Sequence, residues 1–432
     1  KSDRRMDLWH WLVLSAVVVA LLAWLTQPDP QPLLGIYAQA GKWYGLKFHL
    51  MKAVIAWRQS NSRKPNAKKD YLMASQFGSG GARDIREQEK KQSLPADKPN
   101  AADAVFFNAA SKDGTYFTLG TAQRQNDIIN LFFVFHSPEL RGTFIVPEML
   151  SDTNVKSVPS HSEWRTASGF SVRCLEPMRK WSISFKGELV KSEGQRFFTV
   201  VGPESTEHLS SAERVAAELQ LEWNHFGDHF DFDVDVSPTS IAHSLAIQPW
   251  SRELFDKLKA SHQSHYEQFG FLTGTARVGK APPLALSLTS MRDHTITAHR
   301  DWAEIRRYIM MTYHLDDGTC IHTSLISMPE VVFSHLEFGY VVTPKKKKYA
   351  VDRIFLHLAN VGERKEPFPR AFNYSFTAGP LHYDVQVTVL GAHSFKMGLK
   401  QATQVNEQPA KFIANGISGQ GFVEAAYRIS PY

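Results

Sequence analysis

Six ionisable side chains crowd into one short segment of the chain, residues 291–302. They are Arg292, Asp293, His294, His299, Arg300 and Asp301, within the sequence MRDHTITAHRDW. Acids, bases and cations are costly to bury unless they bond to one another or to a ligand. The segment is therefore either a structural ion network or a general acid–base site.

The spacing within this segment indicates how a site could form. His294 and His299 are five residues apart, and Asp293 and Asp301 are eight apart, so a single alternating strand does not hold them all. If one strand ends near residue 295 and the next element begins near residue 299, the charged groups converge at the mouth of a barrel. A carboxyl group in an apolar cavity has a raised pKa and can donate a proton.

The elements around the segment are mostly short and alternating. From residue 103 onward the chain breaks into period-2 runs separated by turns, with one hairpin turning at residues 316–318. One helical stretch, residues 250–269, interrupts this pattern, with Ser251 as its N-cap. We therefore expect an all-β protein of two tandem barrels, residues 103–247 and 270–432, joined by a helical segment at 248–269.

The N-terminal region differs from the rest of the chain in its sequence pattern. Residues 8–25 form an apolar run of 18 residues, the lower limit for a membrane-spanning helix. Eight Lys and Arg residues follow between positions 42 and 69, so the positive-inside rule predicts a single-pass anchor with the barrels in the cytosol. A cleaved signal peptide or a buried helix are the alternatives.

A second helix is predicted just after this run. Residues 34–58 mix aromatics, apolar residues and Lys at helical spacing, which is typical of an interfacial helix with Trp43, Tyr44 and Trp57 at the headgroup level. The alternative is an ordinary helix packed on the body. Residues 1–70 would form this membrane region, and the polar residues 71–102 a linker.

Composition excludes several classes of protein. A net charge of +6 is too small for a strong nucleic-acid binder, and two distant cysteines make neither a disulfide framework nor a zinc pattern. No signature of a metalloprotease, serine hydrolase or nucleotide-binding loop is present. The acid-rich segment 223–238 is either a solvated or helix-capping turn or a metal site, and we favour the turn. We expect no cofactor and no metal.

Several motifs carry a resemblance to a known family. They are DAVFFNAASKDGTYFTLGTAQR (103–124), LEPMRKWSISFKG (175–187), QPWSRELFDKLKASHQSHYEQFG (248–270), MRDHTITAHRDW (291–302), LEFGYV (336–341) and GQGFVEAAYR (419–428). With them the chain resembles the hydroxyneurosporene synthase (carotenoid 1,2-hydratase) and AttH-like proteins, and most of all the region that precedes phosphoenolpyruvate-synthase-like domains in some animal proteins. The resemblance implies two tandem lipocalin-like barrels and cofactor-free hydratases or cyclases acting on apolar substrates. It makes Asp293–His294 the counterpart of an Asp-His pair at the inter-domain cavity.

We therefore expect a cofactor-free hydratase, lyase or cyclase that acts on an isoprenoid-like lipid by acid catalysis. Asp293 would be the general acid, Arg292 and His294 would set its pKa and orientation, and Glu424 would assist from the last strand. The expected ligand-binding residues are His299, Arg300, Asp301, Trp302 and Tyr313. The alternatives are a non-catalytic carrier of lipid or pigment and an interaction subunit with a degenerate site.

Overall fold

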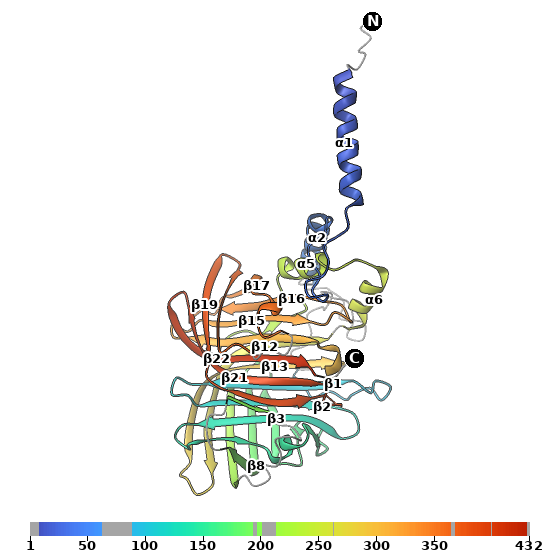
Figure 1. Cartoon of the computed structure of the whole chain (residues 1–432). Helices are drawn as coiled ribbons and strands as arrows, with labels where there is room; N and C mark the ends of the chain where they lie inside the picture. The colour runs from blue at the N-terminus through green and yellow to red at the C-terminus, as the bar shows by residue number, and fades with distance from the viewer. Residues whose placement is uncertain are drawn as a thin grey trace.

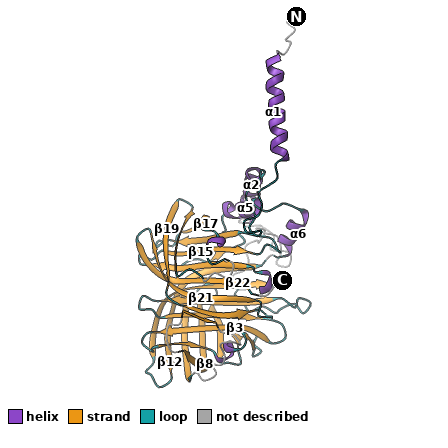
Figure 2. Ribbon diagram, in the orientation of Figure 1, coloured by secondary structure: helices purple, strands orange, loops and turns teal. Residues whose placement is uncertain are grey.

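Most elements of the described chain are β-strands, as the alternation of apolar and polar residues predicts. The computed structural model describes residues 8–62, 89–192, 197–200, 213–261, 263–363, 368–398 and 400–429. Within these residues, two antiparallel sheets each close into a barrel of eight strands (Figures 1 and 2). The all-β, tandem-barrel class expected from the sequence is confirmed.

The first barrel is closed by strands from both sides of the central helical region. In the described chain its strands run in the order β10-β12-β13-β1-β2-β3-β4-β8, and β8 pairs with β10 to complete the ring. The barrel strands are β1 (Ala102–Ala110), β2 (Tyr116–Gln123), β3 (Ile128–Ser137), β4 (Gly142–Ile145), β8 (Lys180–Ser192), β10 (Arg214–His225), β12 (Ser264–Val278) and β13 (Leu284–Thr297). Short strands attached to it are β5 (Asn154–Lys156), β6 (Trp164–Arg165), β7 (Phe170–Glu176) and β11 (Phe230–Asp231).

The second barrel follows directly along the chain. In the described chain its order is β19-β18-β17-β16-β15-β14-β22-β21, closed by pairing of β19 with β21. Its strands are β14 (Arg307–Leu315), β15 (Cys320–Ser327), β16 (Leu336–Val342), β17 (Lys348–Phe355), β18 (Ala371–Ala378), β19 (Leu381–Val389), β21 (Thr403–Ala414) and β22 (Ile417–Arg428). The strands β20 (Ala392–Met397) and β9 (Phe197–Val200) extend this sheet. The hairpin expected at 316–318 is the turn between β14 and β15, where Gly318 has a φ of +87°.

The predicted boundary between the barrels is wrong. The helix α6 spans only Arg252–Ala260, and the next two strands, β12 and β13, complete the first barrel rather than open the second. The first barrel therefore reaches residue 297, and the second begins at β14. Residues 266–270 of β12 are all buried, because one face lines the barrel interior and the other faces the second barrel. A strand buried on both faces loses the alternation that distinguishes it from a helix.

Ser251 is the N-cap of α6, as predicted. Its Oγ accepts a hydrogen bond from the backbone N–H of Leu254 at 3.1 Å. Replacing Ser251 with alanine should lower the local stability of α6 by about 1 kcal/mol. Hydrogen exchange of the α6 amides measures this effect. Ser251→Asp, which keeps a capping oxygen, should exchange like the wild type, and equal exchange in the alanine variant would contradict the capping role.

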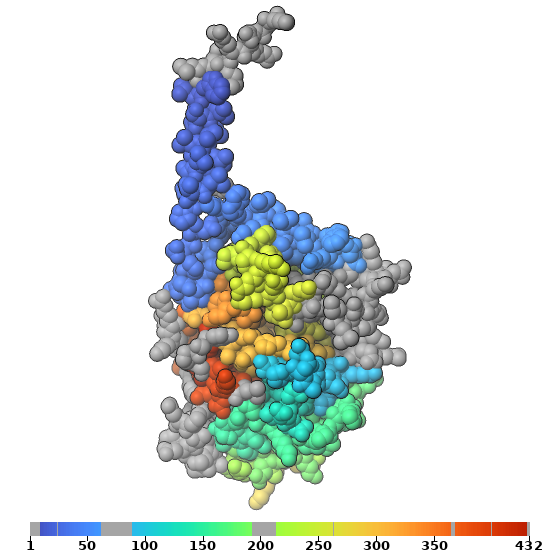
Figure 3. Space-filling model, turned by 90° about the vertical axis from the view of Figure 1, so that its right-hand side faces the viewer, coloured from blue at the N-terminus to red at the C-terminus, as the bar shows by residue number. Residues whose placement is uncertain are grey.

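The described residues contain three further α-helices, two of them at the second barrel. They are α1 (Leu8–Thr26), α2 (Tyr44–Ser62) and α5 (Pro238–Ala246). The helix α2 packs on α5, where the Tyr44 hydroxyl and His243 Nδ1 are 2.7 Å apart. The space-filling view shows α2 in blue beside the yellow-green segment that contains α5 and α6 (Figure 3). Contact of α2 with a membrane stays a prediction.

The helix α1 projects away from the barrels (Figure 1). Its large side chains are exposed, and Trp9 shows 72% of its surface. None of the helices in the described residues has both the length and the apolarity required to cross a bilayer. The single-pass anchor expected at residues 8–25 is therefore not supported. Of the predicted linker 71–102, residues 71–88 lie outside the described residues.

The barrels pack against each other through side chains on their outer faces. Phe132 of β3 stacks on Phe395 of β20 with ring centroids 4.7 Å apart. Asn108 of β1 donates a hydrogen bond to the Thr312 hydroxyl of β14 at 2.8 Å. A single apolar cluster runs from the interior of the first barrel through this contact, and a second cluster fills the interior of the second barrel. The cavity described next lies in the contact between the barrels.

Candidate functional site

The strand β13 separates the side chains that the sequence placed together. Successive side chains of a strand point to opposite faces. Arg292 and His294 therefore point into the first barrel, and Asp293 points out towards the second. The expectation that the three residues act as one group at a cavity is wrong for Arg292 and His294, and the alternation of the strand is the reason.

Inside the first barrel, Arg292 and His294 belong to a buried polar network. The Arg292 guanidinium donates to Glu89 Oε1 at 3.0 Å, and His294 Nε2 lies 2.7 Å from Asp103 Oδ1. Tyr266 links the two halves, because its hydroxyl donates to Glu89 and lies 2.8 Å from His294 Nδ1. Aromatic rings surround the Arg292 guanidinium, namely those of Trp181, Trp223 and Tyr266. Each acid is matched by a base or a donor, so this network is structural.

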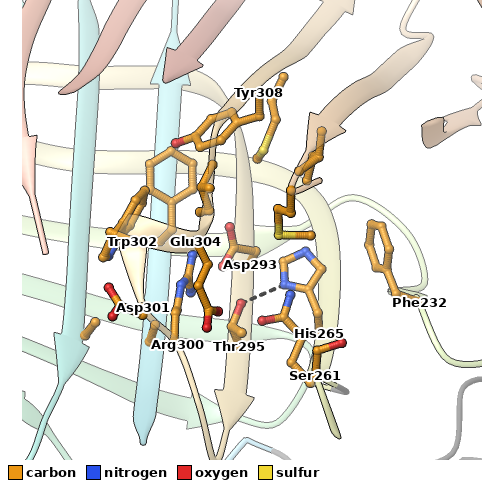
Figure 4. A pocket seen from close by; sticks show the side chains of 18 of the residues that line it. Phe232, Ser261, His265, Asp293, Thr295, Arg300, Asp301, Trp302, Glu304 and Tyr308 are labelled. Atoms are coloured by element: carbon orange, nitrogen blue, oxygen red, sulfur yellow. Dashed lines mark hydrogen bonds between the residues drawn. The ribbon is translucent and has the colours of Figure 1, made fainter. Parts of the chain in front are cut away.

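A cavity of about 310 Å³ lies between the two barrels. Asp293 reaches it from the first barrel, and Tyr308 reaches it from β14 of the second (Figure 4). Glu424 reaches it from β22. Most of the remaining wall is apolar, and its large side chains include Phe106, Phe132, Val236, Met310, Phe338 and Val405. The cavity thus combines a mostly apolar lining with several ionisable groups, an arrangement that a small-molecule site can have.

Burial of the Asp293 carboxyl group favours its protonated form. Its carboxyl group accepts no hydrogen bond from the described residues, and it lies directly opposite Glu267 of β12 in the sheet. Burial raises the pKa of Asp293 above its ordinary value, and the opposing charges of His265 and Arg300 do not cancel this effect. Arg292 does not hold Asp293 in its ionised form, since it is paired with Glu89 on the other face of the sheet.

Glu424 carries a second carboxyl group with an elevated pKa. It accepts a hydrogen bond from the Tyr308 hydroxyl, and it lies directly opposite Glu407 in the pairing of β21 with β22. Burial raises the pKa of both glutamates, and that of Glu407 lies well above its ordinary value because Glu424 adds a like charge beside it. Two buried carboxyl groups this close share a proton rather than both ionising.

A histidine lies on the cavity wall near Asp293. His265 Nδ1 is 2.7 Å from the Thr295 hydroxyl (Figure 4). Its Nε2 is 3.1 Å from Glu267 Oε1. Burial lowers the pKa of His265, but the bond to Glu267 and the nearby acids outweigh burial and leave it raised. Glu267 also accepts from His322 of β15, so it connects the two barrels. From the sequence, His265 was expected to pack on the surface or between domains, and Glu267 was not singled out, because residues 250–269 were predicted to be helical.

Four of the five expected ligand-binding residues line the cavity, and the fifth does not. His299, Arg300, Asp301 and Trp302 are on its wall. Tyr313 lies inside the second barrel instead, where its ring stacks on Phe412 at 4.0 Å between centroids and its hydroxyl meets that of Tyr374. Its position in β14 points it to the barrel interior, whereas Tyr308 on the opposite face points to the cavity.

The acid-rich segment 223–238 contains a helix-capping turn. Ser237 Oγ accepts from the backbone N–H of Thr239 at the start of α5, and Asp235 pairs with Lys348 Nζ at 3.0 Å. Among the described residues, no group of three or more His, Cys, Asp or Glu side chains could hold a metal ion.

One protein-family model matches most of the chain. The model of a family of unknown function (DUF8627) matches residues 12–427. The chain belongs to this family. The comparison with curated proteins found no significant match for this member of DUF8627.

Solved structures similar to this DUF8627 chain share little of its sequence. A putative AttH from Nitrosomonas europaea is 9% identical with a TM-score of 0.45, covering 77% of this chain and 96% of that one. Kievitone hydratase from Nectria haematococca is 7% identical with a TM-score of 0.40, covering 79% and 97%. CghA with Sch210972 is 9% identical with a TM-score of 0.37, covering 77% and 89%. The specific likeness to carotenoid hydratases and to the animal proteins stays a prediction.

Proposed function

We propose that this protein binds an apolar, isoprenoid-like or other lipid in the cavity between its barrels and hydrates, dehydrates or cyclises it by acid catalysis without a cofactor. The observation that carries the proposal is the carboxyl group of Asp293. It borders an apolar cavity, lacks a hydrogen-bond partner among the described residues and has a raised pKa. A carboxyl group that stays protonated near neutral pH can transfer its proton to a carbon atom of an alkene.

In a hydration, the proton of Asp293 goes to one alkene carbon and water adds to the other. The added water then gives up a proton, which the Glu424–Glu407 pair can accept when one of its members is ionised. Tyr308 holds Glu424 at the cavity wall. The apolar lining keeps bulk water away from the carbocation that forms between the two steps.

The test distinguishes an enzyme from a non-catalytic lipid carrier. The protein is purified from its native source, the bound lipid is extracted, and the lipid is incubated with the protein in deuterated water. Acid catalysis predicts that deuterium appears on a carbon atom of the lipid, or that its mass changes by one water, as measured by mass spectrometry. A lipid recovered with neither change would overturn the catalytic proposal and leave a carrier.

A further inference from the structure

Among the described residues, Arg124 is a buried cation that forms no salt bridge with a carboxylate. It follows β2 in the turn to β3, is 5% exposed and lies on the cavity wall. Its Nη2 donates to the backbone carbonyl of Arg300 at 3.0 Å, while Nε and Nη1 have no hydrogen-bond partner among the described residues. Burying a guanidinium that has no carboxylate partner is costly unless a ligand supplies the opposite charge.

A second arginine lies beside it on the same wall. The Arg300 guanidinium lies over the Trp302 ring at 5.2 Å and forms no ion pair with the described carboxylates (Figure 4). The nearest acids in sequence are already engaged. Asp301 Oδ1 accepts from a backbone N–H of the turn that follows it, and Glu304 Oε1 lies 2.8 Å from His299 Nε2. Each of these carboxylates thus has one other partner, although Asp301 still raises the pKa of Arg124 through its charge.

Two other buried arginines of the described residues each have a carboxylate partner, although Arg292 Nε and Nη1 also form no hydrogen bond. Arg292 lies 3.0 Å from Glu89 Oε1, and Arg307 lies 3.0 Å from Glu363 Oε2. Arg124 has no such partner, and burial together with repulsion from Arg300 lowers its pKa to about 10, although Asp301 opposes this. Two like charges beside an apolar cavity form a site for an anion, since guanidinium groups bind carboxylate and phosphate oxygens through paired hydrogen bonds.

We propose that the ligand of this cavity carries an anionic oxygen group, a carboxylate or phosphate, which Arg124 and Arg300 bind while the apolar part fills the remaining space. This inference rests on the proposed function for the location of the site, and it narrows the substrate class to amphipathic acids. The anionic group is fixed at residues 124 and 300, so the arginines act in binding and orientation. Asp293 and Glu424 then meet the apolar part of the same molecule.

The test uses two fluorescent probes that share an aromatic body and differ in charge. Anilinonaphthalene sulfonate is anionic, and phenylnaphthylamine is neutral. The full chain should bind the anionic probe at least about ten-fold more tightly than the neutral one, because a hydrogen bond to a charged group contributes about 1.5–3 kcal/mol. In Arg300→Gln and in Arg124→Gln this preference should fall towards unity, with the affinity for the neutral probe little changed. Competition by dodecanoate and by dodecyl phosphate then distinguishes a carboxylate from a phosphate ligand.

The matched control is Arg277→Gln, an exposed arginine of β12 that does not line the cavity. This substitution removes one positive charge, as the other two do, and the variant should still prefer the anionic probe to the neutral one. Arg124→Lys, which retains a cation at the buried position, should keep part of the preference for the anionic probe. Equal binding of the two probes by the wild type, no saturable binding of the anionic probe, or a preference that survives both glutamine variants would overturn the inference. Deuterium incorporation reports separately on Asp293, so a charge preference without incorporation leaves this inference standing and removes only the catalytic proposal.

Discussion

Replacing Asp293 with asparagine is expected to reduce turnover of the cavity ligand by about 10²- to 10⁴-fold, the usual contribution of a general acid. The amide has nearly the same shape but no acidic proton to transfer to carbon. The rate of deuterium incorporation measures the effect. Because the reaction needs the protonated carboxyl group, the wild-type rate should fall as pH rises through the raised pKa of Asp293.

Binding must be measured beside turnover, because a lost ligand also stops the reaction. Asp293→Asn should retain the probe affinities of the wild type. Asp256→Asn is the matched control, since the Asp256 side chain is 72% exposed on α6 and does not line the cavity. It should leave both turnover and binding unchanged. Unchanged turnover in a folded Asp293→Asn variant would exclude Asp293 as the acid.

The two-barrel architecture could be predicted because several strands keep one exposed face and the others are short runs bounded by turns. In β19, for example, buried residues alternate with exposed ones. The strand β12 could not be recognised, since its residues from Tyr266 to Gly270 are buried on both faces and include the acid Glu267. After Ala260 the apolar residues no longer recur every 3.6 residues, which marks the end of the helix. This change covers too few residues to distinguish the helix from the strand that follows it.

The sequence located the site, but it did not show which residues of the segment face the cavity. The segment 291–302 does supply one wall of the cavity, through Asp293 and Arg300. Which face of β13 points to the cavity depends on its neighbours β1 and β12, and the sequence alone does not give their register. The partners of the cluster are also remote, because Glu89 lies 203 residues from Arg292. No local pattern marks such a contact.

Glu89→Gln is expected to destabilise the first barrel by about 3–5 kcal/mol, the cost of removing one partner from a buried ion pair. The Arg292 guanidinium is fully buried, and Glu89 is its carboxylate partner among the described residues. Although burial raises the pKa of Glu89, Arg292 and Tyr266 outweigh it and hold that pKa below its ordinary value, so the ionised form is the one that is lost. Urea unfolding, with hydrogen exchange of the β12 and β13 amides, measures the change.

Two variants decide whether this loss comes from the unpaired charge. Glu253→Gln breaks an exposed pair with Lys257 on α6 and should cost less than about 0.5 kcal/mol. Glu89→Gln combined with Arg292→Met removes both charges, and it should be more stable than Glu89→Gln alone, because no cation is then left buried without a partner. If the double variant is instead less stable than the single one, packing of Arg292 between Trp181 and Trp223 contributes more than its charge. The structural role of the network would then depend on these aromatic contacts rather than on the ion pair.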